Sequence, residues 1–366
     1  MPVACAWEME DWTLPLQFYE FGGKPYDIGY QHGEALRDMI QDFYQDVLAR
    51  TARSLGCSIE QAERKALLEI RKYIPYLAQK APHLVTEAEG IGAGAGLELE
   101  KVLVLNTDFE LELEIGECTG FVANEFATAH GEVIMAQNRD RTKHDVEHTV
   151  AMRLVPDKGP SMVMSILGGH LGSIGLNSAG IAMGHNFLRS TGWRPGIPRG
   201  ILPRLILEQE SLQGVINLMS QSHRASSRNF LIANATGEVC DIETTPSSYR
   251  ILWAEAERGY VVHANHYLHP DLVHFNDDCL DAPGNTTWRH RRMEHLMAQH
   301  RGKVDVETTK AMLSDHADYP LSVCVHPIPD VCDTMSISSI IALPAEKRIL
   351  ITLGNPCCSG WQEFRV

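Results

Sequence analysis

The spacing of apolar residues changes about one third of the way along the chain. Before that point apolar residues recur every three to four positions, as in Ile40, Phe43 and Val47, which is the period of a helix with one buried face. A further helix is expected from Ser58, because Gln61 follows three residues later and completes a capping box. These patterns predict that the first third of the chain is mostly helical.

Two glycine patterns lie in this helical region. Gly29 and Gly33 stand four residues apart on one face of a predicted helix, where the absence of side chains would let another backbone approach closely. Another helix is expected to begin at Pro82 and to end in the flexible, glycine-rich stretch 90–96.

After Cys118 the apolar period becomes two, which is typical of strands. Strands are expected at 119–126, 132–137, 149–155, 162–167, 173–176, 181–185, 230–233, 238–243, 249–253, 260–263, 336–342 and 348–353, and helices at 202–221, 286–300 and 306–314. Such alternation, with helices interspersed, predicts antiparallel sheets covered by helices in a layered α+β domain. We expect one compact unit in which segment 1–117 packs on segment 118–366.

Composition narrows the class of partner. The chain has 366 residues, of which 44% are apolar, and its net charge is −15. This charge argues against nucleic acid or an anionic membrane as a partner, because both require a basic face. A small molecule with an anionic tail needs only a local basic pocket.

The chain shows neither an apolar run of membrane-spanning length nor a secretory signal. Its nine cysteines are scattered, so a reduced, cytoplasmic protein is expected. The pair Cys357 and Cys358 is interpreted as two small buried residues.

Cys118 is the candidate nucleophile. It starts a predicted strand after a bend that contains Gly116, and the small residues Thr119 and Gly120 leave room for a substrate. On this local evidence alone a structural cysteine would be the default. Our hypothesis is that the chain itself cleaves the bond between Glu117 and Cys118. The new α-amine, with an ordinary pKa of about 7.7–8.0, could then act as the base for the neighbouring thiol.

Other polar residues could assist this sulfur. Asn138 and Asp140 end the strand that is expected to pair with the Cys118 strand, although both residue types also favour turns. An asparagine amide such as that of Asn229 is a neutral donor suited to an oxyanion. Arg289 and Arg292 lie three apart on one helix face and could bind a carboxylate, whereas Arg291 is expected to lie in solvent.

A histidine-rich stretch offers a rival chemistry. Histidines three residues apart, such as His263, His266 and His269, can bind zinc when they lie on a helix. This stretch follows a predicted strand and ends at Pro270, so ordinary loop histidines are the preferred interpretation. Asn265 and His266 are expected to line the substrate pocket.

Taken in order, these motifs resemble the acyl-coenzyme A:6-aminopenicillanic-acid acyltransferase family of N-terminal-nucleophile hydrolases. The resemblance covers about Tyr19 to Pro356. Its markers are Tyr26-x-x-Gly29-x-x-x-Gly33, Cys118-Thr119, Gln137-Asn138-x-Asp140, Gly175-Leu176-Asn177-x-x-Gly180, Ser227-x-Asn229-Phe230, Asn265-His266, Arg289 and Gly354-Asn355-Pro356. It implies a four-layer αββα sandwich, made as a precursor that cleaves itself before Cys118 into an α/β heterodimer, which could associate further into a homo-oligomer.

The resemblance also implies residue roles. Cys118 would be the nucleophile, Asp140 would hold or orient its α-amine, Asn229 would form the oxyanion hole, and Arg289 would lie near the site, with Arg292 as the fallback. The residues expected to bind the substrate are Thr119, Gln137, Asn138, Asn265, His266 and Arg292. No cofactor and no metal are expected. Family members usually have glycine directly before the cysteine, where this chain has Glu117. Glycine eases strained geometry, so slow processing, or none, stays open.

The expected reaction is attack of the Cys118 thiolate on an amide or thioester carbonyl, followed by transfer of the acyl group to water or to an amine. Amide hydrolysis is favoured because water is always present. An acyl-CoA-dependent N-acyltransferase, a non-enzymatic small-molecule binding protein on the same scaffold and a metal hydrolase are the alternatives.

Overall fold

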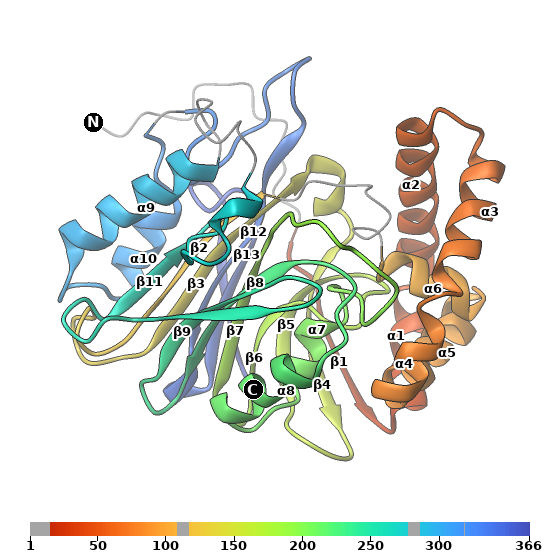
Figure 1. Cartoon of the computed structure of the whole chain (residues 1–366), viewed down its shortest axis with the longest axis horizontal. Coiled ribbons are helices and arrows are strands. Elements are labelled where there is room, and N and C mark those ends of the chain that lie inside the picture. The colour runs from red at the N-terminus through yellow and green to blue at the C-terminus, as the bar shows by residue number, and fades with distance from the viewer. Residues whose placement is uncertain (1–14, 108–116, 277–285, 318) are drawn as a thin grey trace.

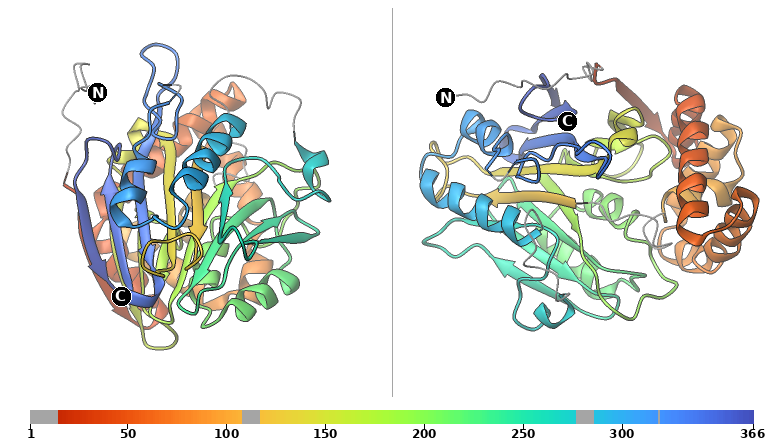
Figure 2. Two further views of the ribbon diagram at one scale, coloured as in Figure 1. Left: turned by 90° about the vertical axis from the view of Figure 1, so that its left-hand side faces the viewer. Right: turned by 90° about the horizontal axis from the view of Figure 1, so that it is seen from above.

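Two β-sheets lie face to face between layers of helices (Figures 1 and 2). The computed structural model describes residues 15–107, 117–276, 286–317 and 319–366. The eight-stranded sheet has the order β1 (Phe18–Gly23), β4 (Thr149–Pro156), β5 (Met162–Leu167), β6 (Ile174–Asn177), β7 (Ile181–Phe187), β8 (Arg228–Asn234), β9 (Val239–Thr244) and β10 (Tyr249–Trp253). The six-stranded sheet has the order β11 (Tyr260–His263), β2 (Glu117–Ala123), β3 (Ile134–Thr142), β12 (Thr334–Leu343), β13 (Arg348–Leu353) and β14 (Trp361–Arg365).

The helices fall into two groups along the chain, before and after the start of β2. Before the first strand of the six-stranded sheet come α1 (Pro25–Ala35), α2 (Arg37–Leu55), α3 (Ile59–Ile70), α4 (Ile74–Lys80), α5 (Pro82–Ala95) and α6 (Leu99–Leu105). The later helices are α7 (Leu202–Leu207), α8 (Leu212–Gln221), α9 (Thr286–His300) and α10 (Val306–Leu313). Within the described ranges, no helix has the length and apolar character needed to cross a bilayer.

Side chains of β2 and β3 show how the layers are packed. Val122 and Met135 point between the sheets, where they join a buried cluster with Leu231 of β8. The adjacent positions, Phe121 and Ala136, point the other way and pack with residues of α9 and α10. Successive side chains of a strand alternate between the two faces of its sheet. The six-stranded sheet therefore separates a core between the two sheets from a second core beneath α9 and α10. The expected α+β class and four-layer αββα sandwich are therefore confirmed.

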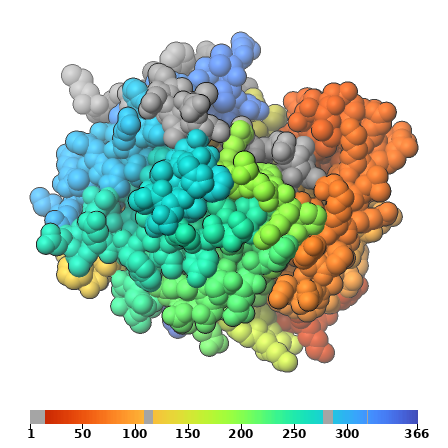
Figure 3. Space-filling view, in the orientation of Figure 1, coloured from red at the N-terminus to blue at the C-terminus, as the bar shows by residue number. Residues whose placement is uncertain are grey.

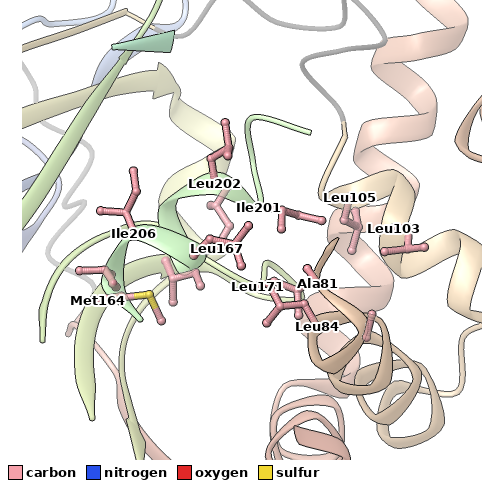
Figure 4. Close-up of a cluster of buried hydrophobic side chains, with 14 of the residues drawn as sticks. Ala81, Leu84, Leu103, Leu105, Met164, Leu167, Leu171, Ile201, Leu202 and Ile206 are labelled. Carbon is pink, nitrogen blue, oxygen red and sulfur yellow. The ribbon is translucent and has the colours of Figure 1, made fainter. Parts of the chain in front are cut away.

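The N-terminal helices share one core with the eight-stranded sheet. Leu84 of α5 and Leu105 of α6 belong to the same buried cluster as Met164 of β5 (Figure 4). Arg204 of α7 donates two hydrogen bonds of 2.9 Å to the carboxylate of Glu87 in α5, and both side chains are buried. These helices form one side of the molecule (Figure 3). Division of the chain at residues 117 and 118 stays a prediction.

Close backbone contact between α1 and α5 depends on glycine. A Cβ atom on Gly29 would lie 1.9 Å from the carbonyl oxygen of Glu87, and one on Gly90 would lie 2.3 Å from that of Tyr26. The approach expected at Gly29 is confirmed. The expected flexibility of the stretch 90–96 is wrong, because α5 continues through Ala95 and its small residues pack directly on α1.

Other sequence expectations meet mixed results. The capping box is confirmed: Ser58 Oγ accepts from Gln61 N, and Ser58 N donates to Gln61 Oε1, both at 3.2 Å. The single helix expected at 202–221 is wrong, because α7 ends at Leu207 and α8 begins afresh with Ser211 as its cap. One strand pair, β1 with β4, is parallel rather than antiparallel, and β14 was not expected.

Candidate active site

Cys118 lies near the start of β2, between β11 and β3. In the ladder with β3, Glu117 pairs with Asp140 and Cys118 pairs with Arg139. Since Val122 points between the sheets, the period of two directs the Cys118 side chain to that same face. Glu117, one residue earlier, points toward α9. The candidate nucleophile and its neighbouring carboxylate thus lie on opposite faces of one sheet.

The main chain of Cys118 is held on both sides of its α-carbon. Its nitrogen donates to Asn265 Oδ1 at 2.8 Å, and Asn265 Nδ2 donates in turn to the carbonyl oxygen of Phe187 at 3.1 Å. Its carbonyl oxygen accepts from Arg289 Nη1 at 2.7 Å. The predicted pocket residue Asn265 therefore contacts the nitrogen that cleavage would convert into an amine.

Arg289 connects most of the predicted residues. Nη1 also donates to Thr119 Oγ1 at 2.7 Å, and Nη2 lies 3.1 Å from both Asn265 Oδ1 and Glu117 Oε2. The side chain is only 1% exposed. Arginine suits such a buried position because its planar guanidinium can donate several hydrogen bonds at once. The structure thus places Arg289 itself, rather than the fallback Arg292, beside Cys118.

The neighbouring arginines of α9 lie elsewhere. Arg292 Nε and Nη2 form a bidentate ion pair with Asp315, at 2.8 and 2.6 Å, so the fallback residue does not reach Cys118. Arg291 is exposed, as expected. Gly116, in the bend expected before Cys118, lies outside the described residues.

Asp140 is a fully buried carboxylate on the α9 side of the sheet. Its Oδ1 accepts from Ser336 Oγ at 2.6 Å, and its Oδ2 lies 4.0 Å from Arg289 Nη1. Burial raises the pKa of Asp140 to about 7; Arg289 and the Ser336 hydrogen bond oppose this rise, and Glu117 adds to it. In the uncut chain the nitrogen of Cys118 donates to Asn265 rather than to this carboxylate.

The sulfur of Cys118 is not activated in this state. The residue is 6% exposed, and burial raises the pKa of its thiol to about 11, with a further rise from Asp140; the backbone N–H of Asp140 and the charges of Arg139 and Arg289 oppose it. The thiol is therefore protonated near neutral pH. An attack by this sulfur needs a base close to it.

The pH dependence of stability reports on Asp140. Its folded pKa of about 7 lies above the ordinary value of 3.8, so between these values the folded chain binds more protons than the unfolded chain. This group therefore stabilises the fold below about pH 4, and that contribution is lost as pH rises through 7, by up to about 1.4 kcal/mol per pH unit. We expect Asp140→Asn to remove this slope in urea unfolding of a Cys118→Ala chain, a background that keeps the predicted self-cleavage out of the measurement. Exposed Asp157→Asn is the control, and an unchanged slope in Asp140→Asn would contradict the assignment.

The side chains of Gln137 and Asn138 are both fully buried, and both form hydrogen bonds with backbone groups of the protein. Gln137 exchanges hydrogen bonds with the backbone of His185 in β7, at 2.6 and 2.8 Å. Asn138 donates to the carbonyl oxygens of Leu313 and Val323, at 2.8 and 2.9 Å. Asn138 therefore lies on the α10 side, away from the Cys118 sulfur. Both amides join layers of the fold through these hydrogen bonds, and their expected contact with a substrate stays a prediction.

Asn229 lies between the sheets, in a polar network around β9. Its Oδ1 accepts from the backbone N–H of Asn186 at 2.9 Å, and its Nδ2 donates to Asp241 Oδ1 at 2.6 Å. Burial raises the pKa of Asp241 to about 7. One amide hydrogen of Asn229 is thus used by Asp241, and the second is left for another acceptor. Within the described ranges no hydrogen bond joins Asn229 to Cys118.

The three histidines of the rival metal site do not converge. His263 lies within 2.9 Å of Glu243, and although burial alone would lower its pKa, Asp241 and Glu243 raise it to about 9. His266 contacts Thr286 Oγ1 at 2.9 Å, and its pKa falls to about 2 through burial. His269 accepts from the backbone of Asp271. His263, His266 and His269 form no common ligand group in the part of the chain that the structure describes.

Arg139 lies beside Cys118, although the sequence did not mark it as a candidate. It pairs directly with Cys118 across the β2–β3 ladder and is 4% exposed. Burial, together with Arg141, lowers the pKa of Arg139 to about 9. A guanidinium on this face can hold the thiolate or a carboxylate. The available signal was its place between Asn138 and Asp140, because strand alternation sets the middle residue on the nucleophile's side.

Two kinds of sequence comparison bear on this site. Residues 127–357 match the model of the family "Acyl-coenzyme A:6-aminopenicillanic acid acyl-transferase". The chain is 28% identical over 340 residues to the acyl-coenzyme A:6-aminopenicillanic-acid-acyltransferase 40 kDa form of Emericella nidulans, covering 91% of each chain. It is 25% identical over 345 residues to an uncharacterized protein of Archaeoglobus fulgidus, covering 80% of this chain and 56% of that protein.

Solved structures of low sequence identity also match. The chain is 10% identical to a mutant of conjugated bile acid hydrolase from Clostridium perfringens, with a TM-score of 0.47 over 68% of this chain and 97% of that one. It is 12% identical to penicillin V acylase from Agrobacterium tumefaciens, with a TM-score of 0.48 over 68% and 86%.

Proposed function

Given that the chain belongs to the acyl-coenzyme A:6-aminopenicillanic acid acyl-transferase family, and is thereby an enzyme of acyl transfer or amide hydrolysis, we propose that Cys118 becomes its N-terminal nucleophile by self-cleavage. The observation that supports this proposal is a pair of hydrogen bonds that fix the main chain of Cys118. Asn265 accepts from its nitrogen and Arg289 donates to its carbonyl oxygen. These contacts leave the nitrogen beside the sulfur of the same residue when the preceding bond opens.

Self-cleavage uses the same sulfur as turnover. The thiol attacks the carbonyl carbon of Glu117, its proton passes to the nitrogen of Cys118, and the peptide bond gives way to a thioester. Water then hydrolyses this thioester, which leaves a carboxylate on Glu117 and a free thiol and amine on Cys118. Glu117 is paired with Arg289 at 3.1 Å, and this pairing holds the bond beside the sulfur even without the usual glycine.

In the mature protein the α-amine of Cys118 is the base that the buried thiol lacks. It accepts the thiol proton as the sulfur attacks a small-molecule amide, and returns it to the leaving amine. Asn265 accepts a hydrogen bond from this amine and orients it. Asn229 has one amide hydrogen left for the tetrahedral oxyanion, an interaction that contributes about 3–4 kcal/mol in a related setting.

The acyl-enzyme can pass its acyl group to water or to a second amine. We favour hydrolysis because water reaches every acyl-enzyme that an amine can reach. Transfer from an acyl-coenzyme A donor is the alternative, and the name of the Emericella nidulans relative favours it. The ratio of acid to new amide formed in the presence of an added amine distinguishes the two.

Intact mass under denaturing conditions tests the proposal. We expect two fragments, divided before Cys118, whose masses sum to one water more than the 40.8 kDa chain. N-terminal sequencing of the larger fragment should begin Cys118-Thr119. A single uncut species that turns over amides would overturn the mechanism, and an uncut, inactive species would favour the non-enzymatic binding protein.

A further inference from the structure

Four metal-binding side chains converge away from Cys118. His316, Cys324 and His326 lie in the loop between α10 and β12, and Cys357 lies in the turn after β13. One ligand atom from each lies within 4.8 Å of the other three. Cys324 is buried and the other three are half-buried, so the group is closed to bulk solvent on one side. The sequence predicts that Cys357 and Cys358 are both buried, whereas Cys357 is half-buried and Cys358 is exposed.

The distances are those of ligands around one ion. His316 Nε2 and His326 Nε2 lie 3.1 Å apart, and the two sulfurs lie 3.7 Å apart. His326 Nε2 lies 3.4 Å from Cys324 Sγ and 3.5 Å from Cys357 Sγ. Zinc bonds of about 2.3 Å to sulfur and 2.0–2.1 Å to nitrogen, in a tetrahedron, require ligand separations of about 3.3 Å (N–N), 3.6 Å (N–S) and 3.8 Å (S–S).

Hydrogen bonding alone does not account for this cluster. A ring nitrogen carries either one hydrogen or one lone pair, yet His326 Nε2 has three neighbours between 3.1 and 3.5 Å. A disulfide between Cys324 and Cys357 would require a bond of about 2.05 Å, well below the 3.7 Å observed. A cation at the centre satisfies all four side chains at once.

We propose that His316, Cys324, His326 and Cys357 bind one structural zinc ion. Two thiolates and two imidazoles in a tetrahedron are a ligand set typical of zinc. Four protein ligands leave no open position for a substrate, so the ion's role is structural. Binding releases one proton from each thiol to solvent. Asn355 supports the site from outside, since its Nδ2 donates to the carbonyl oxygen of Val325 at 2.6 Å and lies 3.4 Å from Cys324 Sγ.

The ligand loop also reaches the candidate active site. Val325, between two ligands, donates its backbone N–H to Ser336 Oγ at 3.0 Å, and Ser336 Oγ donates to Asp140 Oδ1 at 2.6 Å. Asp315, directly before His316, holds Arg292 of α9, three residues beyond Arg289. An ion that fixes this loop therefore fixes the partner of a buried active-site carboxylate. The zinc site itself does not depend on the proposed reaction.

Metal analysis of the purified full-length chain tests this proposal. We expect about one zinc per chain, and a content near zero in Cys324→Ser and in Cys357→Ser. Cys332→Ser, a thiol of the same loop outside the cluster, should keep its zinc. His269→Ala should also keep it, which separates this site from the rival histidine set. A wild-type chain that stays free of zinc after dialysis against a micromolar zinc salt, or a Cys324→Ser chain that keeps its full zinc, would overturn the proposal.

A second measurement covers variants that fail to fold. Wild-type chain produced in cobalt-supplemented medium should show intense visible d–d bands and thiolate-to-cobalt absorption, as tetrahedral cobalt with two thiolates does. Chelation of the zinc should lower the Tm by at least about 5 °C, and should lower it little in Cys324→Ser. An octahedral cobalt spectrum, or a Cys324–Cys357 disulfide found by mass mapping of freshly purified protein, would overturn the site.

Discussion

Replacing Cys118 with alanine is expected to leave a single uncut chain and to lower turnover by at least about 10⁴-fold. The sulfur attacks both the Glu117 carbonyl and the substrate in the proposed mechanism, so one change removes both reactions. Intact mass spectrometry under denaturing conditions shows whether the chain has been cleaved before residue 118. Turnover is measured as hydrolysis of a chromogenic N-acyl anilide or an acyl thioester that the wild type accepts.

Cys57→Ser is the matched control, because this half-exposed thiol lies just beyond the end of α2 and far along the chain from β2. It should be cut and should turn over substrate as the wild type does. An acyl thioester should also add its acyl mass to the wild-type fragment that begins at Cys118, and not to Cys118→Ala. Undiminished turnover by the alanine variant would show that another group performs the chemistry.

Replacing Arg289 with methionine is expected to lower kcat/KM by about 10²-fold or more and the free energy of unfolding by about 3–5 kcal/mol. The change removes hydrogen bonds to the Cys118 carbonyl, Thr119 and Asn265 and leaves the carboxylates of Asp140 and Glu117 without their nearby cation. Urea unfolding and steady-state kinetics measure the two effects. Arg291→Met, on the exposed face of the same helix, is the control.

Arg289 acts through its neighbours, so its role needs a measurement that simple loss of stability would not alter. Its charge lowers the pKa of both Asp140 and Cys118. The acid limb of the pH profile of kcat/KM should therefore move to higher pH in Arg289→Met and return toward the wild-type position in Arg289→Lys. A profile that keeps its position in the methionine variant would assign Arg289 to packing alone.

Much of the fold followed from local patterns. The change of apolar period after Cys118 predicted the passage from helices to sheets. The expected pairing of β2 with β3 is also observed, and it sets Asp140 opposite Glu117. One error shows what local patterns leave out. The stretch 90–96 was expected to be flexible because glycine destabilises isolated helices, whereas packing on α1 outweighs that cost. Sequence spacing also left open which face of β3 carries Asn138, and the structure directs its side chain toward α10.

The sequence by itself determined most of the elements, the layered α+β class and the position of Cys118 near the start of a strand, because periodicity and short hairpins depend on residues close together in the chain. Only the tertiary structure decided which side chains meet at Cys118. Asn265 lies 147 residues away and Arg289 lies 171 residues away, and the gathering of His316, Cys324, His326 and Cys357 joins a loop to a distant turn. Such contacts depend on how whole layers pack, and no local pattern records them.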